Sequence, residues 1–410
     1  GDQAKLLSAN DTSGFTYRGR FANREQAASI GYETSQKAHN ALRWLLARQG
    51  KYIDGEMTVV WKLPQNLKEK DSNLALDVVD LFGDTQETFL ADFDWAAECR
   101  DEDDIELDRK FAEKLNQAMA GYRAKLQPDD EVIILSVDAA TTGRLAVTYY
   151  QEVPGNEFID RVLHWHQNCT WPRWIKLHET KKWVFINNTA PSPNEIALAA
   201  YGTEQEKGYL ACSDKLKKTT IRRILPCIIG LSPKIPADIV KAAVNRASNP
   251  QAYSSFVWQN CVAPVACAMI KYNEFDGKVN SMELEKDRSY LFGQLLAILE
   301  KVEERALYLQ ESKTDDRLTN AKKMWNVYTR RPAITYERLY SHIVRAYLKR
   351  LNPGARAKIE NEIMQIINVL RETDGFNNNP LNERYLLGYY EEREKLIKSK
   401  GEKSNEGGEE

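Results

Sequence analysis

The clearest hydrophobic periodicity in this chain lies between Gly31 and Gly50. Apolar residues there recur at positions i, i+3, i+4, i+7 and i+8, and they are Ala38, Ala41, Leu42, Leu45 and Leu46. At about 100° per residue they form one arc, which predicts an amphipathic helix that packs this arc against a core. Gly50 follows the last of them, where a glycine in the left-handed conformation would end the helix.

Shorter apolar runs predict strands. Residues 57–61 form a run of β-branched and aromatic side chains. Residues 131–150 fit two strands joined by a Thr-Thr-Gly turn, and residues 132–135 are apolar throughout, which is typical of a strand buried on both faces. Residues 158–167 have helical spacing, and residues 182–186 form a further short run. The order strand, strand, helix, strand predicts a small α/β core.

From residue 194 onward the pattern is helical. Amphipathic helices with short proline- or glycine-containing loops between them favour an antiparallel bundle at the C-terminal end. The predicted helices of this bundle are 283–312, 317–331, 334–351, 355–372 and 383–399. The predicted fold class is therefore α+β and mainly helical, with a small α/β core that contains a strand hairpin, followed by the C-terminal antiparallel helical bundle.

The same pattern predicts the domain organisation. A mixed α/β region spans 1–200, a helical connecting region spans 201–281, and the C-terminal helical bundle spans 282–400. The last segment, 401–410, reads GEKSNEGGEE. It contains no apolar side chain to bury, so we predict that it is disordered.

Composition fits a soluble globular protein, because 42% of the residues are hydrophobic and 28% are charged. No apolar run reaches the ~18 residues that a membrane span needs. The six cysteines are scattered without a CxxC pair, which favours reduced thiols and a cytoplasmic location over a disulfide framework. The motifs GxxxxGK[ST], GxGxxG, HExxH and GxSxG are absent from the sequence. Their absence argues against a nucleotide-driven motor or a hydrolase with a recognisable signature, and we expect no cofactor.

The net charge of −2 conceals a strong segregation of charge. Residues 71–108 contain fourteen acidic side chains against Arg100 alone, a net charge of −13. Residues 214–246 contain eight Lys or Arg against two acidic residues, a net charge of +6. Residues 313–358 contain twelve Lys or Arg against three acidic residues, a net charge of +9. The basic segments predict an anionic partner, with nucleic acid first.

The larger basic segment alternates cations with aromatic residues, as proteins that bind single strands do. The cations are Lys322, Lys323, Arg330, Arg331, Arg338, Arg345, Lys349 and Arg350. The aromatic residues are Trp325, Tyr328, Tyr336, Tyr340 and Tyr347. In a continuous 334–351 helix, Arg338, Arg345 and Lys349 stand at i, i+7 and i+11 and share one face. The alternative is a solvated face with the aromatic side chains in the core, and each tyrosine taken singly is more typical of core.

The smaller basic segment offers a second set of cations. They are Lys217, Lys218, Arg222 and Arg223. We expect them to contact nucleic acid only if the larger segment does. The alternative is ordinary surface charge on a helix.

A metal site could use the set His164, His166, Cys169 and His178. If residues 158–167 form a helix, His164 and His166 point about 200° apart and cannot share one ion. Zinc would require this segment to be a strand or a loop. We therefore expect packed or solvated histidines and no metal.

Asp138 ends an apolar strand and is followed by a hairpin, an arrangement that resembles the first strand of ribonuclease-H-like nucleases. Such a site needs further carboxylates that converge on Mg²⁺. Glu131 and Asp160 are available, although no sequence feature places them beside Asp138. The alternative is a turn-forming aspartate beside Thr-Thr-Gly.

Several segments, in the same order along the chain, resemble the large subunit of the type I-C CRISPR surveillance complex, Cascade. They are FTYRGRF (15–21), SQKAHNALRWLLARQG (35–50), TVVW (58–61), VIILSVDAATTGRLAVTYY (132–150), IRRILPCII (221–229), IPADIVKAAVNRASNP (235–250), YLFGQLLAILEKVEERA (290–306) and YLLGYYEER (385–393). Where the family pattern has GYYHQR, this chain has GYYEER, so we expect no histidine site there. Members of the family extend further at the N-terminus, which implies that this chain is N-terminally truncated.

The resemblance implies a non-catalytic subunit that binds target DNA, both as a duplex and as the displaced single strand. It implies help with recognition of the flanking motif and with R-loop formation, and recruitment of a helicase–nuclease. The implied partners are the guide-RNA complex, the other Cascade subunits and that effector, with no membrane. The family also implies that the bundle can be made separately as a small subunit from an internal start, for which Met282 is well placed.

Two other classes of function stay open. The chain could be a metal-dependent nuclease that uses Asp138. It could also be a protein scaffold without affinity for DNA.

Overall fold

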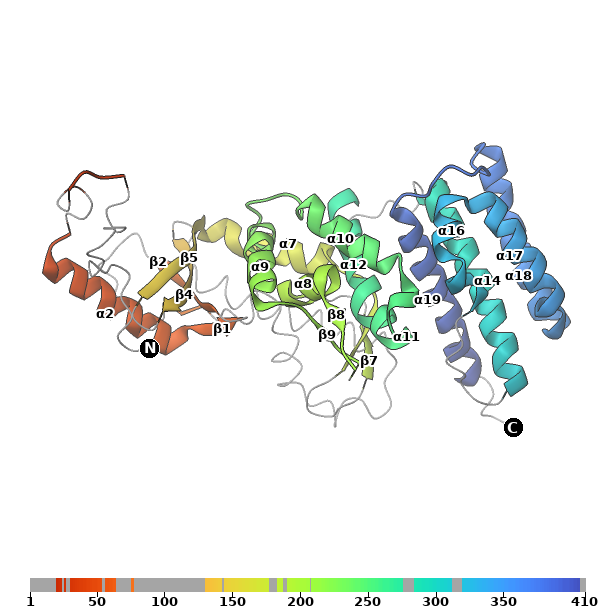
Figure 1. Ribbon diagram of the computed structural model, residues 1–410, viewed down its shortest axis with the longest axis horizontal. Coiled ribbons are helices and arrows are strands. Elements are labelled where there is room, and N and C mark those ends of the chain that lie inside the picture. The colour runs from red at the N-terminus through yellow and green to blue at the C-terminus, as the bar shows by residue number, and fades with distance from the viewer. Residues whose placement is uncertain are drawn as a thin grey trace. The chain divides into compact units, whose positions relative to one another are not determined.

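The computed structural model describes a mainly helical α+β protein, as predicted (Figure 1). It describes residues 20–23, 26, 30–53, 56–63, 75–76, 130–141, 144–176, 183–186, 190–206, 208–275, 284–311 and 319–405. The chain forms two compact units. One contains residues 1–167, 174–194 and 213–233, and the other contains residues 168–173, 195–212 and 234–410. The boundaries predicted after residues 200 and 281 stay a prediction.

The first unit contains an antiparallel sheet with the strand order β1-β2-β4-β5, in which β3 also pairs with β2. The strands are β1 (Lys51–Ile53), β2 (Glu56–Leu63), β3 (Ala75–Leu76), β4 (Glu131–Thr141) and β5 (Arg144–Pro154). The predicted hairpin is confirmed as β4 and β5. The register pairs Val59 with Leu135 and Thr58 with Ser136, so alternate residues of each strand point to opposite faces of the sheet.

One face of this sheet is apolar and is covered by α2 (Tyr32–Gln49). Leu42 of α2 packs there against Val59 and Leu135. The predicted helix is confirmed, but its predicted apolar arc is only partly used, because Ala38 and Ala41 are exposed. The sheet against which α2 packs is short. It therefore buries only part of the apolar arc that the sequence predicts.

Gly50 ends α2 for a different reason from the one predicted. Its φ of −68° and ψ of 133° are extended rather than left-handed, so the predicted left-handed cap is wrong. A Cβ at this position would lie 2.5 Å from the carbonyl oxygen of Leu46. The close approach of the backbone to the preceding turn therefore requires glycine here.

Further elements follow the sheet along the chain. The predicted helix at 158–167 is confirmed as α7 (Gly155–Asn168), whose side chains Phe158, Val162 and Trp165 are buried. Two short two-stranded sheets and several helices come next, and their bounds are β6 (Arg173–Lys176), β7 (Trp183–Ile186), α8 (Pro193–Tyr201), β8 (Thr203–Glu204), β9 (Leu210–Ala211), α9 (Asp214–Ile228), α10 (Ala237–Ala247), η2 (Pro250–Ala252), α11 (Ser255–Val257), η3 (Trp258–Val262) and α12 (Ala263–Phe275). No helix among the described residues is long and apolar enough to span a bilayer.

The second unit ends in the predicted helical bundle. Its elements are α14 (Arg288–Glu311), α15 (Asn320–Lys323), α16 (Trp325–Arg330), α17 (Pro332–Ala346), η4 (Leu348–Arg350), α18 (Pro353–Glu372) and α19 (Arg384–Asn405). The predicted 317–331 helix is divided at Met324, and the predicted 334–351 helix ends at Ala346. Helix α19 continues through Asn405 into the predicted tail, and residues 406–410 lie outside the described residues.

Two glycines bring α14 and α19 into close backbone contact (Figure 1). A Cβ on Gly293 of α14 would overlap the carbonyl oxygen of Tyr385, and a Cβ on Gly388 of α19 would overlap that of Tyr290. Each glycine ends the same sequence pattern, Tyr-Leu-x-Gly. The crossing is therefore reciprocal, and both helices need a residue without a side chain at it.

Candidate nucleic-acid interface

The face of the sheet opposite α2 carries both buried apolar residues, such as Val60 and Ile134, and polar ones. Two of the cations predicted to bind nucleic acid contact this face. Lys218 of α9 forms an ion pair with Asp138 of β4, with Nζ 3.2 Å from Oδ2. Arg222, one turn further along α9, forms an ion pair with Glu56 of β2. Glu56 is buried and also accepts a 2.7 Å hydrogen bond from Thr148. Both cations are thus neutralised by carboxylates of the sheet.

Other polar groups satisfy one another on the same face. The hydroxyls of Thr58 and Ser136 lie 2.8 Å apart, and Lys62 Nζ lies 3.8 Å from Asp130 Oδ2. All four residues are buried. These buried polar groups are consistent with a structural role. Each one has a partner, and a buried polar or charged group that lost its partner would destabilise the fold. The remaining predicted cations of α9 are Lys217, which is half-buried, and Arg223, which is exposed.

Two of the carboxylates considered for a nuclease, Glu131 and Asp138, lie far apart on one strand. Glu131 and Asp138 stand seven residues apart on β4, which at about 3.3 Å per residue separates them by roughly 20 Å. Asp160 lies on the exposed side of α7. Two carboxylates so far apart cannot ligate one Mg²⁺ ion.

The histidines considered for zinc are also separate. His164 and His166 both lie on α7, as the helical reading required, and therefore point to different sides of it. Cys169 is buried, with its Sγ 3.9 Å from the carbonyl oxygen of Ala268. No group of three His, Cys, Asp or Glu able to hold a metal occurs among the described residues. His178 lies outside them.

The aromatic residues of the larger basic segment are mostly core. Trp325, Tyr328 and Tyr336 are buried, and Tyr328 donates a 2.7 Å hydrogen bond to the carbonyl oxygen of Phe292. Tyr340 is half-buried and stacks on Tyr336 with the ring centroids 5.7 Å apart. The alternative reading, in which these aromatic residues form the core, describes Trp325, Tyr328 and Tyr336 correctly.

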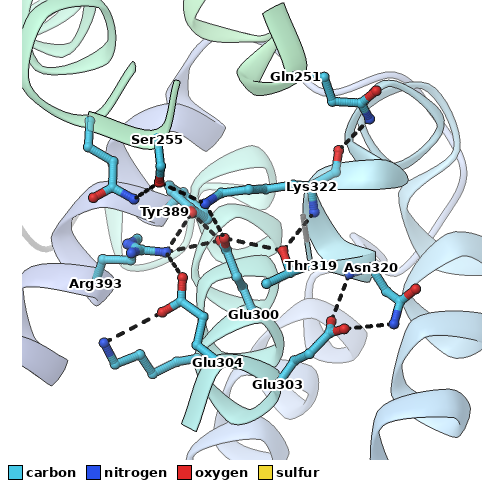
Figure 2. Close-up of polar contacts among 12 residues, drawn as sticks. Gln251, Ser255, Glu300, Glu303, Glu304, Thr319, Asn320, Lys322, Tyr389 and Arg393 are labelled. Carbon is cyan, nitrogen blue, oxygen red and sulfur yellow. Dashed lines mark hydrogen bonds and ion pairs between the residues drawn. The ribbon is translucent and has the colours of Figure 1, made fainter. Parts of the chain in front are cut away.

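Lys322 is buried as well, and it belongs to an ionic network inside the bundle (Figure 2). Its Nζ lies 3.2 Å from the carboxylate of Glu300, which is completely buried on α14. Arg393 of α19 reaches the same carboxylate at 3.1 Å, and Tyr389 donates a hydrogen bond to it. The Nζ of Lys322 also lies 5.9 Å from the ring centroid of Trp258. The charge of Lys322 is therefore paired inside the bundle, and we do not count this residue among the exposed cations.

The charge balance in this network favours an ionised Glu300. Burial alone would raise the pKa of its carboxyl group, but Arg393 and Lys322 outweigh burial and hold the pKa below its ordinary value. Thr319 adds a 3.4 Å hydrogen bond to the same carboxylate. The neighbouring Glu303 accepts two hydrogen bonds from Asn320, one at 2.8 Å and one at 2.7 Å, which anchors the start of α15 to α14.

Sequence reasoning did not identify Glu300 or Arg393. The available signal was the position of Glu300, which falls eight residues after Phe292 and four after Leu296, on the apolar face of α14. A charged residue at such a position predicts a buried partner of opposite sign. The sequence does not reveal that the partners are Lys322 and Arg393, because they lie 22 and 93 residues away.

The other cations of the larger basic segment are exposed. They are Lys323, Arg330, Arg331, Arg338, Arg345, Lys349 and Arg350. They lie on α15, α16, α17, η4 and the residues between them. In the part of the chain that the structure describes, no ion pair joins any of them to a carboxylate. The side chains therefore present positive charge to solvent.

The prediction that Arg338, Arg345 and Lys349 share one helix face is wrong for Lys349. Helix α17 ends at Ala346 because Tyr347 has a φ of −126°, and Lys349 lies in the separate turn η4. Arg338 and Arg345 do share a face of α17, where they line an open hollow of about 460 Å³. Its other lining residues are Ile334, Glu337, Ser341 and His342. This hollow brings two guanidinium groups, one carboxylate and two further hydrogen-bonding groups to one surface, with a net positive charge.

Further sequence predictions concern residues outside those that the structure describes. Met282, the predicted internal start, lies outside the described residues. The acidic segment 71–108 also lies outside them, apart from the two residues of β3.

Comparison with known proteins supplies the family. The family model described as CRISPR-associated protein (Cas_Csd1) matches residues 1–397 of the 410 in the chain. No curated protein matches the chain. The match covers the first compact unit, all but the last 13 residues of the second, and all the segments that resemble a CRISPR subunit. The chain therefore belongs to the CRISPR-associated protein (Cas_Csd1) family.

Proposed function

We propose that this chain is a non-catalytic, DNA-binding large subunit of a type I-C CRISPR Cascade complex. Membership in a CRISPR-associated family supports the class of complex. The observation that carries DNA binding is the set of seven exposed cations from Lys323 to Arg350, which lack carboxylate partners among the described residues. Cations of this kind bind the phosphate backbone whatever the base sequence.

In this proposal the C-terminal bundle holds the displaced single strand. Arg338 and Arg345 stand seven residues apart on α17, about 10.5 Å along the helix axis. They can contact different phosphates of one strand, and an Arg–phosphate contact can be bidentate. The subunit would assist flanking-motif recognition and R-loop formation, and would help to recruit the helicase–nuclease. The guide-RNA complex and the other Cascade subunits are its proposed partners.

The test reverses three of the exposed charges in Arg338→Glu, Arg345→Glu and Lys349→Glu. Neutralised phosphates make log K fall with log salt at a slope near −0.7Z for single strands. We expect the triple variant to bind single-stranded DNA more weakly, with a slope flatter by about 2. Electrophoretic mobility or fluorescence anisotropy at several salt concentrations measures both quantities.

A matched control reverses Arg356 and Lys358 on α18, whose charges are offset by Glu360 and Glu362 one turn later. We expect this control to change the slope by much less. Unchanged DNA affinity in the triple variant would refute the proposal. Entry of the chain into a reconstituted complex without any affinity for DNA would instead favour a protein scaffold.

A further inference from the structure

Helix α2 is held firmly on one side and is open to solvent on the other. Leu42 is buried against the sheet, and Leu45 and Leu46 are half-buried beside it. The opposite side carries Trp44, whose side chain is 52% exposed. Among the side chains that the structure describes, Trp44 is the only exposed tryptophan.

Cations accompany this exposed ring. The spacing of Lys37, Ala41, Trp44 and Arg48 is i, i+4, i+7 and i+11, so the four residues form one stripe along the outer side of α2. The guanidinium carbon of Arg48 lies 4.8 Å from the ring centroid of Trp44. Lys37 forms an ion pair with Glu33 at 2.7 Å, and both side chains are highly exposed. An exposed pair of this kind contributes little to stability and is readily exchanged for a phosphate.

This stripe differs from the basic surface of the C-terminal bundle. There the cations are exposed, but Trp325, Tyr328 and Tyr336 are buried and cannot stack on a base. Tyr340 and Tyr347 are half-buried. On α2 a large ring and the cations are exposed together. Proteins that hold unpaired strands combine phosphate contacts with rings on which bases stack.

We infer that the outer stripe of α2 binds unpaired bases of single-stranded DNA, with a base stacked on Trp44 and the adjoining phosphates held by Lys37 and Arg48. Ala41, between Lys37 and Trp44 in the stripe, has only a methyl side chain. Arg48 lies four residues beyond Trp44 and Lys37 seven residues before it, about 6 Å and 10.5 Å along the helix. The inference rests on the proposed function in one respect, which is that the strand is DNA.

The experiment compares two ligands of equal length, an oligothymidylate and an abasic oligodeoxyribose phosphate. Both carry the phosphates, but only the first carries bases that can stack. For the full chain we expect Trp44→Ala to weaken oligothymidylate binding by about tenfold and to leave abasic binding unchanged. Trp44→Phe keeps a smaller ring and should restore part of the loss. Tyr150→Ala is the matched control, because Tyr150 is a ring of similar exposure on β5.

The outcomes separate this inference from the proposed function. The charge-reversed bundle should bind both ligands more weakly by the same factor, since it loses phosphate contacts alone. Equal binding of the two ligands by the unmodified chain, or unchanged oligothymidylate binding in Trp44→Ala, would overturn the stacking site. A Trp44→Ala defect seen with oligouridylate RNA and absent with oligothymidylate would also overturn it, because the inference commits to DNA.

Discussion

Lys322 and Lys323 are adjacent in the sequence, but their side chains have different surroundings. Lys322 is buried beside Glu300 and above the ring of Trp258, whereas Lys323 is exposed. Helix α15 turns by about 100° between one residue and the next, so one side chain points into the bundle and the other points out. The two lysines therefore have separable roles.

Replacing each lysine by methionine tests these roles. Lys322→Met removes one of the two cations that neutralise a fully buried carboxylate, so we expect the free energy of unfolding to fall by about 3 kcal/mol. Lys323→Met should change it by about 0.5 kcal/mol or less. Urea unfolding measures both values.

The two lysines should behave in the opposite way towards DNA. We expect Lys323→Met to flatten the salt slope for single-stranded DNA by about 0.7, and Lys322→Met to leave the slope unchanged. The slope is read from binding titrations under conditions in which both variants are folded. A Lys322→Met variant with full stability and a flattened slope would show that the buried assignment is incorrect.

Glu300 should make the stability of the second unit depend on acid pH. Its pKa in the folded chain is below the ordinary value, because Arg393 and Lys322 outweigh the effect of burial. The ionised carboxylate therefore contributes its full stability above the ordinary carboxyl pKa of about 4.3, and this contribution is lost as the pH falls through the lowered pKa. We expect Glu300→Gln to lower Tm at pH 7 and to lower it progressively less in acid. Glu337→Gln, an exposed carboxyl on α17, is the control, and thermal melts across the acid range provide the measurement.

At the scale of elements, the reciprocal crossing of α14 and α19 decides how closely the two helices pack. Gly293 and Gly388 each face a carbonyl oxygen of the other helix without room for a side chain. Alanine at either position must push the helices apart or strain the backbone. We expect Gly293→Ala and Gly388→Ala each to lower the free energy of unfolding by about 2 kcal/mol.

Gly354 on α18 provides the control for this prediction. A Cβ there would have only the side-chain oxygen of Asn352 as a neighbour, at 3.9 Å. Gly354→Ala should be neutral or slightly stabilising, because alanine narrows the conformations of the unfolded chain. Similar losses of stability at all three glycines, measured by urea unfolding, would argue against a specific helix crossing.

The elements themselves were largely predictable. Helix α2, the β4–β5 hairpin and α7 follow from periodicity that is local in the sequence. The break between α17 and η4 was not, because the apolar pattern continues through Tyr347 while the backbone leaves the helix there. The sequence also predicted too wide a buried face for α2. The width of that face depends on the size of the sheet against which the helix packs.

At the scale of the whole molecule, a variant of Asp138 can distinguish a structural role of this residue from a catalytic one. Its carboxylate is 3.2 Å from Lys218, and the described residues contain no group of three His, Cys, Asp or Glu that could hold a metal ion. We expect Asp138→Asn to lower Tm by a few degrees, because Lys218 loses its partner. We also expect no DNA cleavage by either form with Mg²⁺ or Mn²⁺.

The hypothesis of a metal-dependent nuclease makes the opposite prediction for the unmodified chain and for Asp138→Asn. It requires cleavage by the unmodified chain and the loss of that cleavage in Asp138→Asn. Gel analysis of labelled DNA after incubation with each metal distinguishes the two readings.

The sequence by itself determined the types of most elements, the α+β class, the segregation of charge and the segments that resemble a CRISPR subunit. These properties depend on residues within a turn or two of one another, or on the order of motifs along the chain. Only the tertiary structure decided which charges are neutralised. Asp138 and Lys218 are 80 residues apart, Glu56 and Arg222 are 166 apart, and Glu300 and Arg393 are 93 apart. Whether a cation meets a carboxylate or solvent depends on which side of its helix it occupies and what packs there, and local sequence does not encode either.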